Sequence, residues 1–232
     1  MYFFHSDRVW QNFPHLRALV CIIHDVAKIK PERVMITETI EETFQRLENA
    51  PESESPSIRA WRNAYAAMGL KPTQYRCAAE ALLRRLRKER TLPRLHPLID
   101  MLNAESVKAA IPIAAFDMAH IVDGITVGPA VGTEIYETFE GGVEHPVPAE
   151  IIFADTAGQA HARRWVYRQG AVSAVNMASN AVLVVAEALH EGAVTDLMEL
   201  KLRIERNVVN LGAAMEESAL LSPDNRRFDF EP

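Results

Sequence analysis

Cysteine and long apolar runs are the two features that this sequence has least of. Only 2 of its 232 residues are cysteine. Cys21 and Cys77 stand in apolar or helical surroundings, which favours free buried thiols in a reducing compartment over a disulfide. No apolar run approaches the about 18–20 residues that span a bilayer, and the N-terminus lacks the basic and apolar regions of a signal peptide. We therefore expect a cytoplasmic protein without a membrane partner.

The sequence also lacks the short patterns of the common catalytic and metal sites. It contains no GxSxG, GxGxxG, Walker loop, HExxH, CxxC or HxxxH pattern. We therefore expect no metal and no cofactor. The histidines have no evident partners along the chain, so each is interpreted as a core or surface residue: His24, His96, His120, His145, His161 and His190.

Acidic residues outnumber basic ones, and the formal net charge of −6 argues against nonspecific binding to nucleic acid such as DNA. The charge is unevenly spread, however. Six basic residues gather between positions 84 and 94, and Glu89 is the only acid among them: Arg84, Arg85, Arg87, Lys88, Arg90 and Arg94. On a helix, such a cluster suits contacts with an RNA backbone. The alternative is a solvated helix end whose cations complement the helix dipole.

Hydrophobic periodicity divides the chain into a helical first half and a β-rich second half. The first half has one apolar run of strand length, 16–26, and helical patterns over 31–48, 57–68, 72–90 and 95–110. Short aliphatic runs separated by turns follow at 124–127, 135–139, 151–154, 161–167 and 181–185. A helix from about 191 closes the pattern, and we expect the polar tail 222–232 to fray. This order indicates one α+β domain over 1–232.

The expected C-terminal helix has a continuous apolar stripe. Its members are Leu197, Leu200, Ile204, Val208, Leu211 and Met215. Such a stripe is typical of a helix that packs on its own core. A helix that docks a partner or a second copy is the alternative, which leaves a homodimer open.

Cations and aromatic residues alternate over 163–169. If this segment is a strand, Arg164 and Arg168 lie on one side and Trp165 and Tyr167 on the other. Two guanidinium groups beside a pocket can hold a phosphate or carboxylate in bidentate fashion. The alternative is an edge strand whose aromatic side chains pack inward.

Two further polar residues flank the expected junction between helix 95–110 and the β-rich half. Asn103 and Asp117 could orient a water molecule or a ribose hydroxyl. Residues of these types more often cap helices and stabilise turns, and we favour that structural interpretation.

Five segments carry a resemblance to a known family in their order and spacing. They are WRNAYAAMGLKPTQYRCAAEALLRR (61–85), LPRLHPLIDMLNAESVKAAIPIAAFD (92–117), DGITVGPAVGTE (123–134), AEIIFADTAG (149–158) and RRWVYRQG (163–170). In these segments the chain resembles the B3/B4 (editing) domain of the bacterial phenylalanyl-tRNA synthetase β subunit, and most of all the free-standing B3/4-domain proteins. The similarity covers roughly 57–187, and nearly the full length for the free-standing type.

The resemblance implies an α+β body with a barrel-like mixed β core in the second half and a long C-terminal helix. The synthetase domain hydrolyses tyrosine wrongly attached to the phenylalanine tRNA, with water as the nucleophile and no metal. This chain departs from that domain at three places. Ala114 stands where the domain has a histidine, Arg168–Gly170 lacks an acid, and Met177–Ser179 is poor in hydroxyl groups. The departures indicate a different ligand in the same cleft.

We therefore expect an RNA-associated protein that binds tRNA or aminoacyl-tRNA. As an enzyme it would be a deacylase that hydrolyses mischarged aminoacyl-tRNA in trans, with no assignable catalytic base. The candidates for substrate binding are Asn103, Asp117, Arg164, Arg168 and Gln169, and those for RNA binding are Arg84, Arg85, Arg87 and Lys88. The alternative is a protein that binds an amino acid or an anionic metabolite in the same cleft without RNA.

Overall fold

The computed structural model describes residues 1–30 and 36–231. Within these ranges the chain combines helices with mixed β-sheets, which confirms the α+β class and the C-terminal helix. The helices are α1 (Asp7–Asn12), α2 (Thr37–Asn49), α3 (Pro56–Ala67), α4 (Ala78–Glu89), α5 (Pro97–Ala109) and α6 (Ala193–Leu211). No helix in the described part is long and apolar enough to cross a membrane.

The strands form two main sheets and a short hairpin. An antiparallel sheet has the order β11 (Ala214–Leu221), β2 (Arg17–His24), β10 (Val182–Ala188) and β3 (Ile113–Asp117). A mixed sheet has the order β12 (Arg227–Asp229), β1 (Tyr2–His5), β4 (Gly124–Pro129), β7 (Ile151–Ala154), β8 (Ala160–Arg163) and β9 (Arg168–Gln169), with β1 and β4 parallel. The hairpin consists of β5 (Tyr136–Glu137) and β6 (Val143–Glu144).

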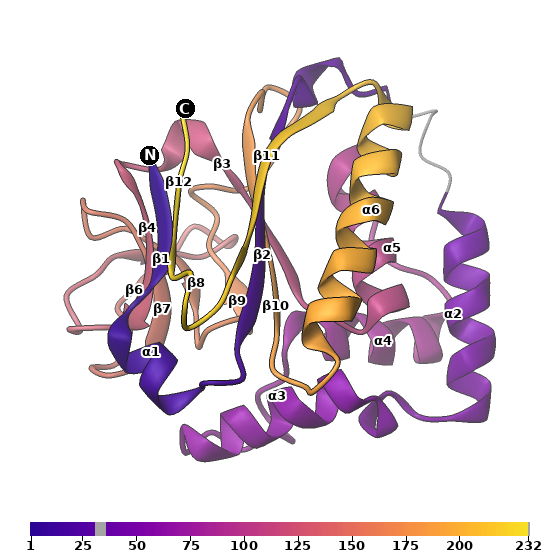
Figure 1. The fold of residues 1–232 in the computed structure, drawn as a ribbon, viewed down its shortest axis with the longest axis horizontal. Coiled ribbons are helices and arrows are strands. Elements are labelled where there is room, and N and C mark those ends of the chain that lie inside the picture. The colour runs from indigo at the N-terminus through magenta and orange to yellow at the C-terminus, as the bar shows by residue number, and fades with distance from the viewer. Residues whose placement is uncertain (31–35, 232) are drawn as a thin grey trace.

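The two sheets face each other, and α5 and α6 cover the other face of the four-stranded sheet (Figure 1). Strand β2 lies between these two cores, which explains why it is apolar at nearly every position. Val20 and Ile22 pack into the core between the sheets. Cys21 and Ile23, on the opposite face, pack against α5 and α6. The predicted strand over 16–26 is therefore confirmed.

The barrel-like core that the resemblance implied is not formed, because both sheets are open in the described residues. The edge strands β9 and β3 approach each other, but no ladder joins them. Instead, the Gln169 side chain donates from Nε2 to the Ala115 carbonyl oxygen over 2.7 Å. A two-residue strand offers too few backbone groups to close a barrel, so a side chain makes the link.

Several predicted boundaries are wrong for local reasons. The helix expected from Pro72 begins at Ala78, after a turn over 71–77, and its first residue donates to Val166 O. The start of the helix expected from Pro31 lies outside the described residues, and α2 begins at Thr37. Helix α6 ends at Leu211 and is capped by Gly212, whose φ of 88° is left-handed, so Met215 lies in β11.

The expectation of a frayed tail over 222–232 is also wrong for residues 222–231, the part of it that the structure describes. Residues Arg227–Asp229 form β12, which pairs antiparallel with β1. Phe228 and Phe230 are buried, and their rings stack at 5.2 Å between centroids. The tail therefore contributes a strand to the six-stranded sheet because its two phenylalanines find apolar neighbours.

Candidate functional site

A small pocket lies where β3 begins and β8 turns towards β9. Its volume is about 50 Å³. Its walls are mostly apolar, with Arg168 and Gln169 as polar members. The lining residues are Ala78, Pro112, Ile113, Ala114, Phe153, Ala162, Trp165, Val166, Tyr167, Arg168 and Gln169. The pocket thus lies between the start of β3 and residues 165–169.

The β8–β9 connection is a strained turn rather than the strand expected over 161–167. Arg164 and Trp165 have φ angles of 47° and 60°, a left-handed conformation that costs about 1–2 kcal/mol per non-glycine residue. Three of the hydrogen bonds that hold the turn are donated by its own N–H groups. Trp165 N donates to Ile151 O over 2.6 Å, Arg164 N to Glu150 Oε1 over 3.1 Å, and Trp165 Nε1 to Glu187 Oε1 over 2.9 Å. Such maintained strain is common at ligand sites.

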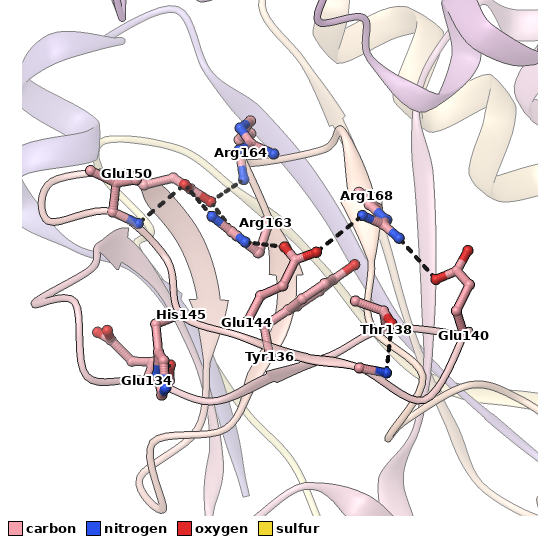
Figure 2. Close-up of polar contacts among 12 residues, drawn as sticks. Glu134, Tyr136, Thr138, Glu140, Glu144, His145, Glu150, Arg163, Arg164 and Arg168 are labelled. Carbon is pink, nitrogen blue, oxygen red and sulfur yellow. Dashed lines mark hydrogen bonds and ion pairs between the residues drawn. The ribbon is translucent and has the colours of Figure 1, made fainter.

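Two of the three arginines of this segment are already paired with carboxylates (Figure 2). Arg163 binds Glu144 and, at 2.9 Å, Glu150. Arg168 binds Glu140 at 3.2 Å and lies 3.7 Å from Glu144. Burial alone would raise the pKa of Glu150, but hydrogen bonds and charge from Arg163 outweigh burial and lower that pKa.

Arg164 differs from its neighbours. Its guanidinium carbon lies 4.9 Å from the centre of the Tyr75 ring and 5.8 Å from that of Tyr167. The predicted alternation of Arg164 and Arg168 on one strand face is wrong, because 164–167 is a turn. The two guanidinium groups therefore have separate surroundings and do not form a joint clamp for one anion.

Gln169 links the walls of the pocket. Its side chain donates to Ala115 O, and its own carbonyl accepts a hydrogen bond from the Tyr136 hydroxyl over 2.8 Å. This residue therefore ties β9 both to β3 and to the hairpin.

The remaining substrate candidates lie away from the pocket lining. Asp117 Oδ1 accepts from Ala119 N over 3.1 Å, and its Oδ2 accepts from Ser179 Oγ over 2.6 Å. These contacts agree with the structural role favoured for Asp117. Asn103 lies in the middle of α5, and its side chain forms no hydrogen bond within the described part of the chain.

The four RNA-binding candidates border one open surface depression on α4. Three of them are partly neutralised. Arg84 and Arg87 bind the carboxylate of Glu52 at 3.1 and 3.0 Å, and Arg85 lies 3.0 Å from Glu89. Lys88 has no ion-pair partner among the described residues.

Two buried histidine networks were not predicted from the sequence. His5 Nε2 lies 2.6 Å from Glu187 Oε1, and His161 lies between Asp155 at 3.3 Å and Ser173 at 2.9 Å. His5 and Glu187 are 182 positions apart, so no spacing rule could have found the pair. The second network has the residue types of a catalytic triad.

That second network is structural. His161 and Ser173 have no solvent-exposed surface, so a substrate could not reach the hydroxyl. Burial lowers the pKa of His161, and the charge of Asp155 opposes that effect. Among the described residues, no group of three or more His, Cys, Asp or Glu side chains is placed to hold a metal ion.

Comparison with known proteins connects this geometry to a family. No curated protein matches the chain. Among solved structures, an N-terminal fragment of the phenylalanyl-tRNA synthetase beta-subunit from Pyrococcus horikoshii is similar, with 8% identity and a TM-score of 0.50. The match covers 92% of this chain but 49% of that one, so this chain spans about half of its length. That likeness shows the fold.

The family follows from the sequence itself. The model of the B3/4 domain matches residues 60–210, well over half of the chain. The matched region contains the pocket, the strained turn and the basic cluster on α4. The resemblance noted from five sequence segments is thereby confirmed, and the chain belongs to the B3/4 domain family.

Proposed function

We propose that this chain binds aminoacyl-tRNA and hydrolyses the ester bond of tRNAs that carry the wrong amino acid, in the cytoplasm where tRNA is charged. Membership of the B3/4 family supports a role connected with tRNA charging, as does a fold shared with a phenylalanyl-tRNA synthetase fragment. The observation that carries the proposal is that one helix, α4, joins a pocket to a basic surface.

Helix α4 has these two features at its two ends. Ala78, its first residue, lines the pocket, and Arg84, Arg85, Arg87 and Lys88 border the depression towards its C-terminal end. At 1.5 Å per residue, the cluster begins six residues (about 9 Å) and ends ten residues (about 15 Å) along the helix from Ala78. A tRNA whose charged end enters the pocket could therefore lay its phosphate backbone along α4. The acidic residues near the cluster reduce its positive charge but do not cancel it. A single carboxylate, that of Glu52, pairs with both Arg84 and Arg87.

The pocket size limits the amino acid. A cavity of about 150 Å³ accommodates benzene, whereas this pocket measures about 50 Å³. A methyl or hydroxymethyl group fits a pocket of this volume, whereas a phenol ring is larger than it. This agrees with the loss of the histidine and the acid that mark tyrosine editing in the synthetase domain. The proposed substrates are tRNAs charged with a small amino acid.

Hydrolysis of the ester bond requires few catalytic groups from the protein. Water attacks the ester carbonyl carbon, the bond to the ribose oxygen breaks, and the ribose oxygen takes the proton that water gives up. The products are free amino acid and uncharged tRNA. Arg168 is the pocket cation, and Glu140 and Glu144 position its guanidinium, so we assign it the stabilisation of the developing oxyanion.

The test is deacylation of a panel of mischarged tRNAs by the purified protein. We expect release of small amino acids, and a loss of about 100-fold in Arg168→Ala, the usual effect of removing one oxyanion donor. Arg168→Lys should keep part of the rate because it keeps the charge. Arg227→Ala, which removes an exposed arginine elsewhere, is the matched control. If no charged tRNA is hydrolysed faster than in buffer, the hydrolase assignment is wrong.

A second variant tests the pocket directly. Ala114 is half-buried in the pocket wall, so Ala114→Leu should fill the space and stop hydrolysis while binding of uncharged tRNA is kept.

The alternative function, capture of a free amino acid or anionic metabolite, predicts ligand affinity in the absence of RNA. Calorimetry with free amino acids separates the two functions.

A further inference from the structure

A half-buried surface beside the pocket combines one cation with two aromatic rings. Arg164 lies over Tyr75 at 4.9 Å and over Tyr167 at 5.8 Å, and the two rings meet edge to face at 5.3 Å. Tyr75 comes from the connection between α3 and α4, whereas the other two come from the β8–β9 turn. We call Tyr75, Arg164 and Tyr167 the aromatic platform.

The cation of this platform lacks the partner that its neighbours have. Arg163 and Arg168 each bind glutamates, but within the described residues no carboxylate lies at ion-pair distance from the Arg164 guanidinium. Figure 2 shows the Arg164 side chain pointing away from the glutamates that hold the other two arginines. The strained backbone at Arg164 fixes this orientation at an energetic cost.

A planar cation beside two half-buried aromatic rings suits one class of ligand. Nucleobases stack on tyrosine rings and on guanidinium planes, and this stacking tolerates any base because each has a π-face. Unpaired nucleotides can present such faces, whereas the bases inside a duplex cannot.

The position of the platform next to the pocket indicates which unpaired nucleotides it would bind. Tyr167 belongs both to the platform and to the pocket lining. In a charged tRNA the amino acid is joined to the terminal ribose, which also carries the terminal base. When the amino acid enters the pocket, that base must lie beside it. We propose that the aromatic platform stacks the unpaired bases at the 3′ end of RNA, an inference that rests on the proposed function.

The experiment uses two RNA hairpins that share a stem. One has a single-stranded 3′ overhang of a few nucleotides, and the other is blunt. Fluorescence anisotropy should show that the wild-type protein binds the overhang form about tenfold more tightly, the size of one stacking contact. Tyr75→Leu should bind both hairpins alike, at the affinity of the wild type for the blunt form.

Two further variants make the test specific. Arg164→Lys keeps the charge and both tyrosines but removes the planar group, so it should lose most of the preference for the overhang. Tyr2→Leu is the matched control, because Arg227 covers Tyr2 at 4.4 Å in the same way on β1. This control should keep the full preference, and thermal unfolding checks that each variant is folded.

The outcomes separate this inference from the function on which it rests. If the wild type binds both hairpins equally, or if Tyr75→Leu and Arg164→Lys keep the preference, the platform does not stack the 3′ end, although RNA binding stands. If the wild type binds neither hairpin, the proposed tRNA binding is wrong and the platform inference falls with it.

Discussion

Burial determines the chemistry of the two cysteines. Cys21 lies in β2 between two cores, and Cys77 precedes α4; both thiols are free and buried. Burial raises the pKa of each to about 12. We predict that a thiol reagent at pH 8 finds no reactive thiol in the native protein and two after unfolding in denaturant, because the thiolate is the reactive species. Rapid reaction of one equivalent in the native protein would contradict the buried placement.

His161 should make stability depend on pH. Burial is the main cause that lowers its pKa below the ordinary value of 6.5; the charge of His120 adds to this effect, and Asp155 opposes it. As the pH falls below about 6.5, the unfolded chain takes up a proton that the folded chain does not bind. The free energy of unfolding should therefore decrease from pH 6.5 towards pH 5.

Urea unfolding at several pH values checks this dependence. His161→Gln removes the titrating group, so its free energy of unfolding should fall less steeply over the same range. The pH dependence of the free energy of unfolding that remains in this variant should come from His96, whose pKa is also lowered by burial. Equal slopes in the variant and the wild type would show that His161 does not carry the effect.

The residues of the site were partly predictable from the sequence. Arg168 and Gln169 line the pocket. The sequence could point to them because they belong to a segment that carries the family resemblance. The side-chain partners were not predictable, because they come from distant positions. Glu140 and Glu144 meet Arg168 only through the hairpin β5–β6, and Tyr75 meets Arg164 only through the packing of α4 beside the turn.

Among the elements, α4 allows the sharpest test because its cations fall into two kinds. Arg85 and Lys88 are surface cations, whereas Arg84 and Arg87 neutralise Glu52, whose side chain is 2% exposed. We predict that Arg85→Ala with Lys88→Ala weakens RNA binding and reduces the slope of log affinity against log salt by about 1–2. The free energy of unfolding should stay unchanged. Unaltered affinity at both low and high salt would remove this surface from RNA binding.

The other pair of cations serves as the structural comparison. Arg84→Ala with Arg87→Ala leaves the Glu52 carboxylate buried without its partners, which should lower the free energy of unfolding by about 1–3 kcal/mol. Urea unfolding of the two double variants side by side separates RNA contact from fold support. The prediction fails if both variants are equally stable.

Element types followed from the sequence more reliably than element ends. Helix α3 and strand β7 agree with the patterns over 57–68 and 151–154. The ends of other elements depended on tertiary contacts. The chain leaves β8 at Arg163 because Trp165 inserts beside Glu187, and α4 starts late because residues 71–77 carry Tyr75 to the β8–β9 turn.

At the scale of the whole molecule, the two chain ends stabilise each other. Strand β12 pairs with β1, and the N-terminal amino group donates to Phe230 O over 2.6 Å. Polar composition alone suggested a frayed tail; the sequence gives no local sign that Phe228 and Phe230 would find apolar neighbours across the fold.

Removal of residues 222–232 should therefore destabilise the fold. Burial of each phenylalanine contributes about 1.5–3 kcal/mol, a large part of the about 5–15 kcal/mol that keeps a domain folded. We predict a clear fall in the urea midpoint, and almost none for Glu231→Ala, which changes an exposed residue of the same tail. Equal midpoints for the long deletion and the intact chain would show that β12 does not support the sheet.

We propose that a small pocket joined to a basic helix selects tRNAs charged with a small amino acid. The most direct measurement is the rate of ester hydrolysis for one tRNA charged with alanine and the same tRNA charged with tyrosine. We expect the protein to release alanine at least tenfold faster than buffer does, and to leave tyrosine at the buffer rate. Hydrolysis of both esters at the buffer rate, or release of tyrosine as fast as alanine, would contradict it.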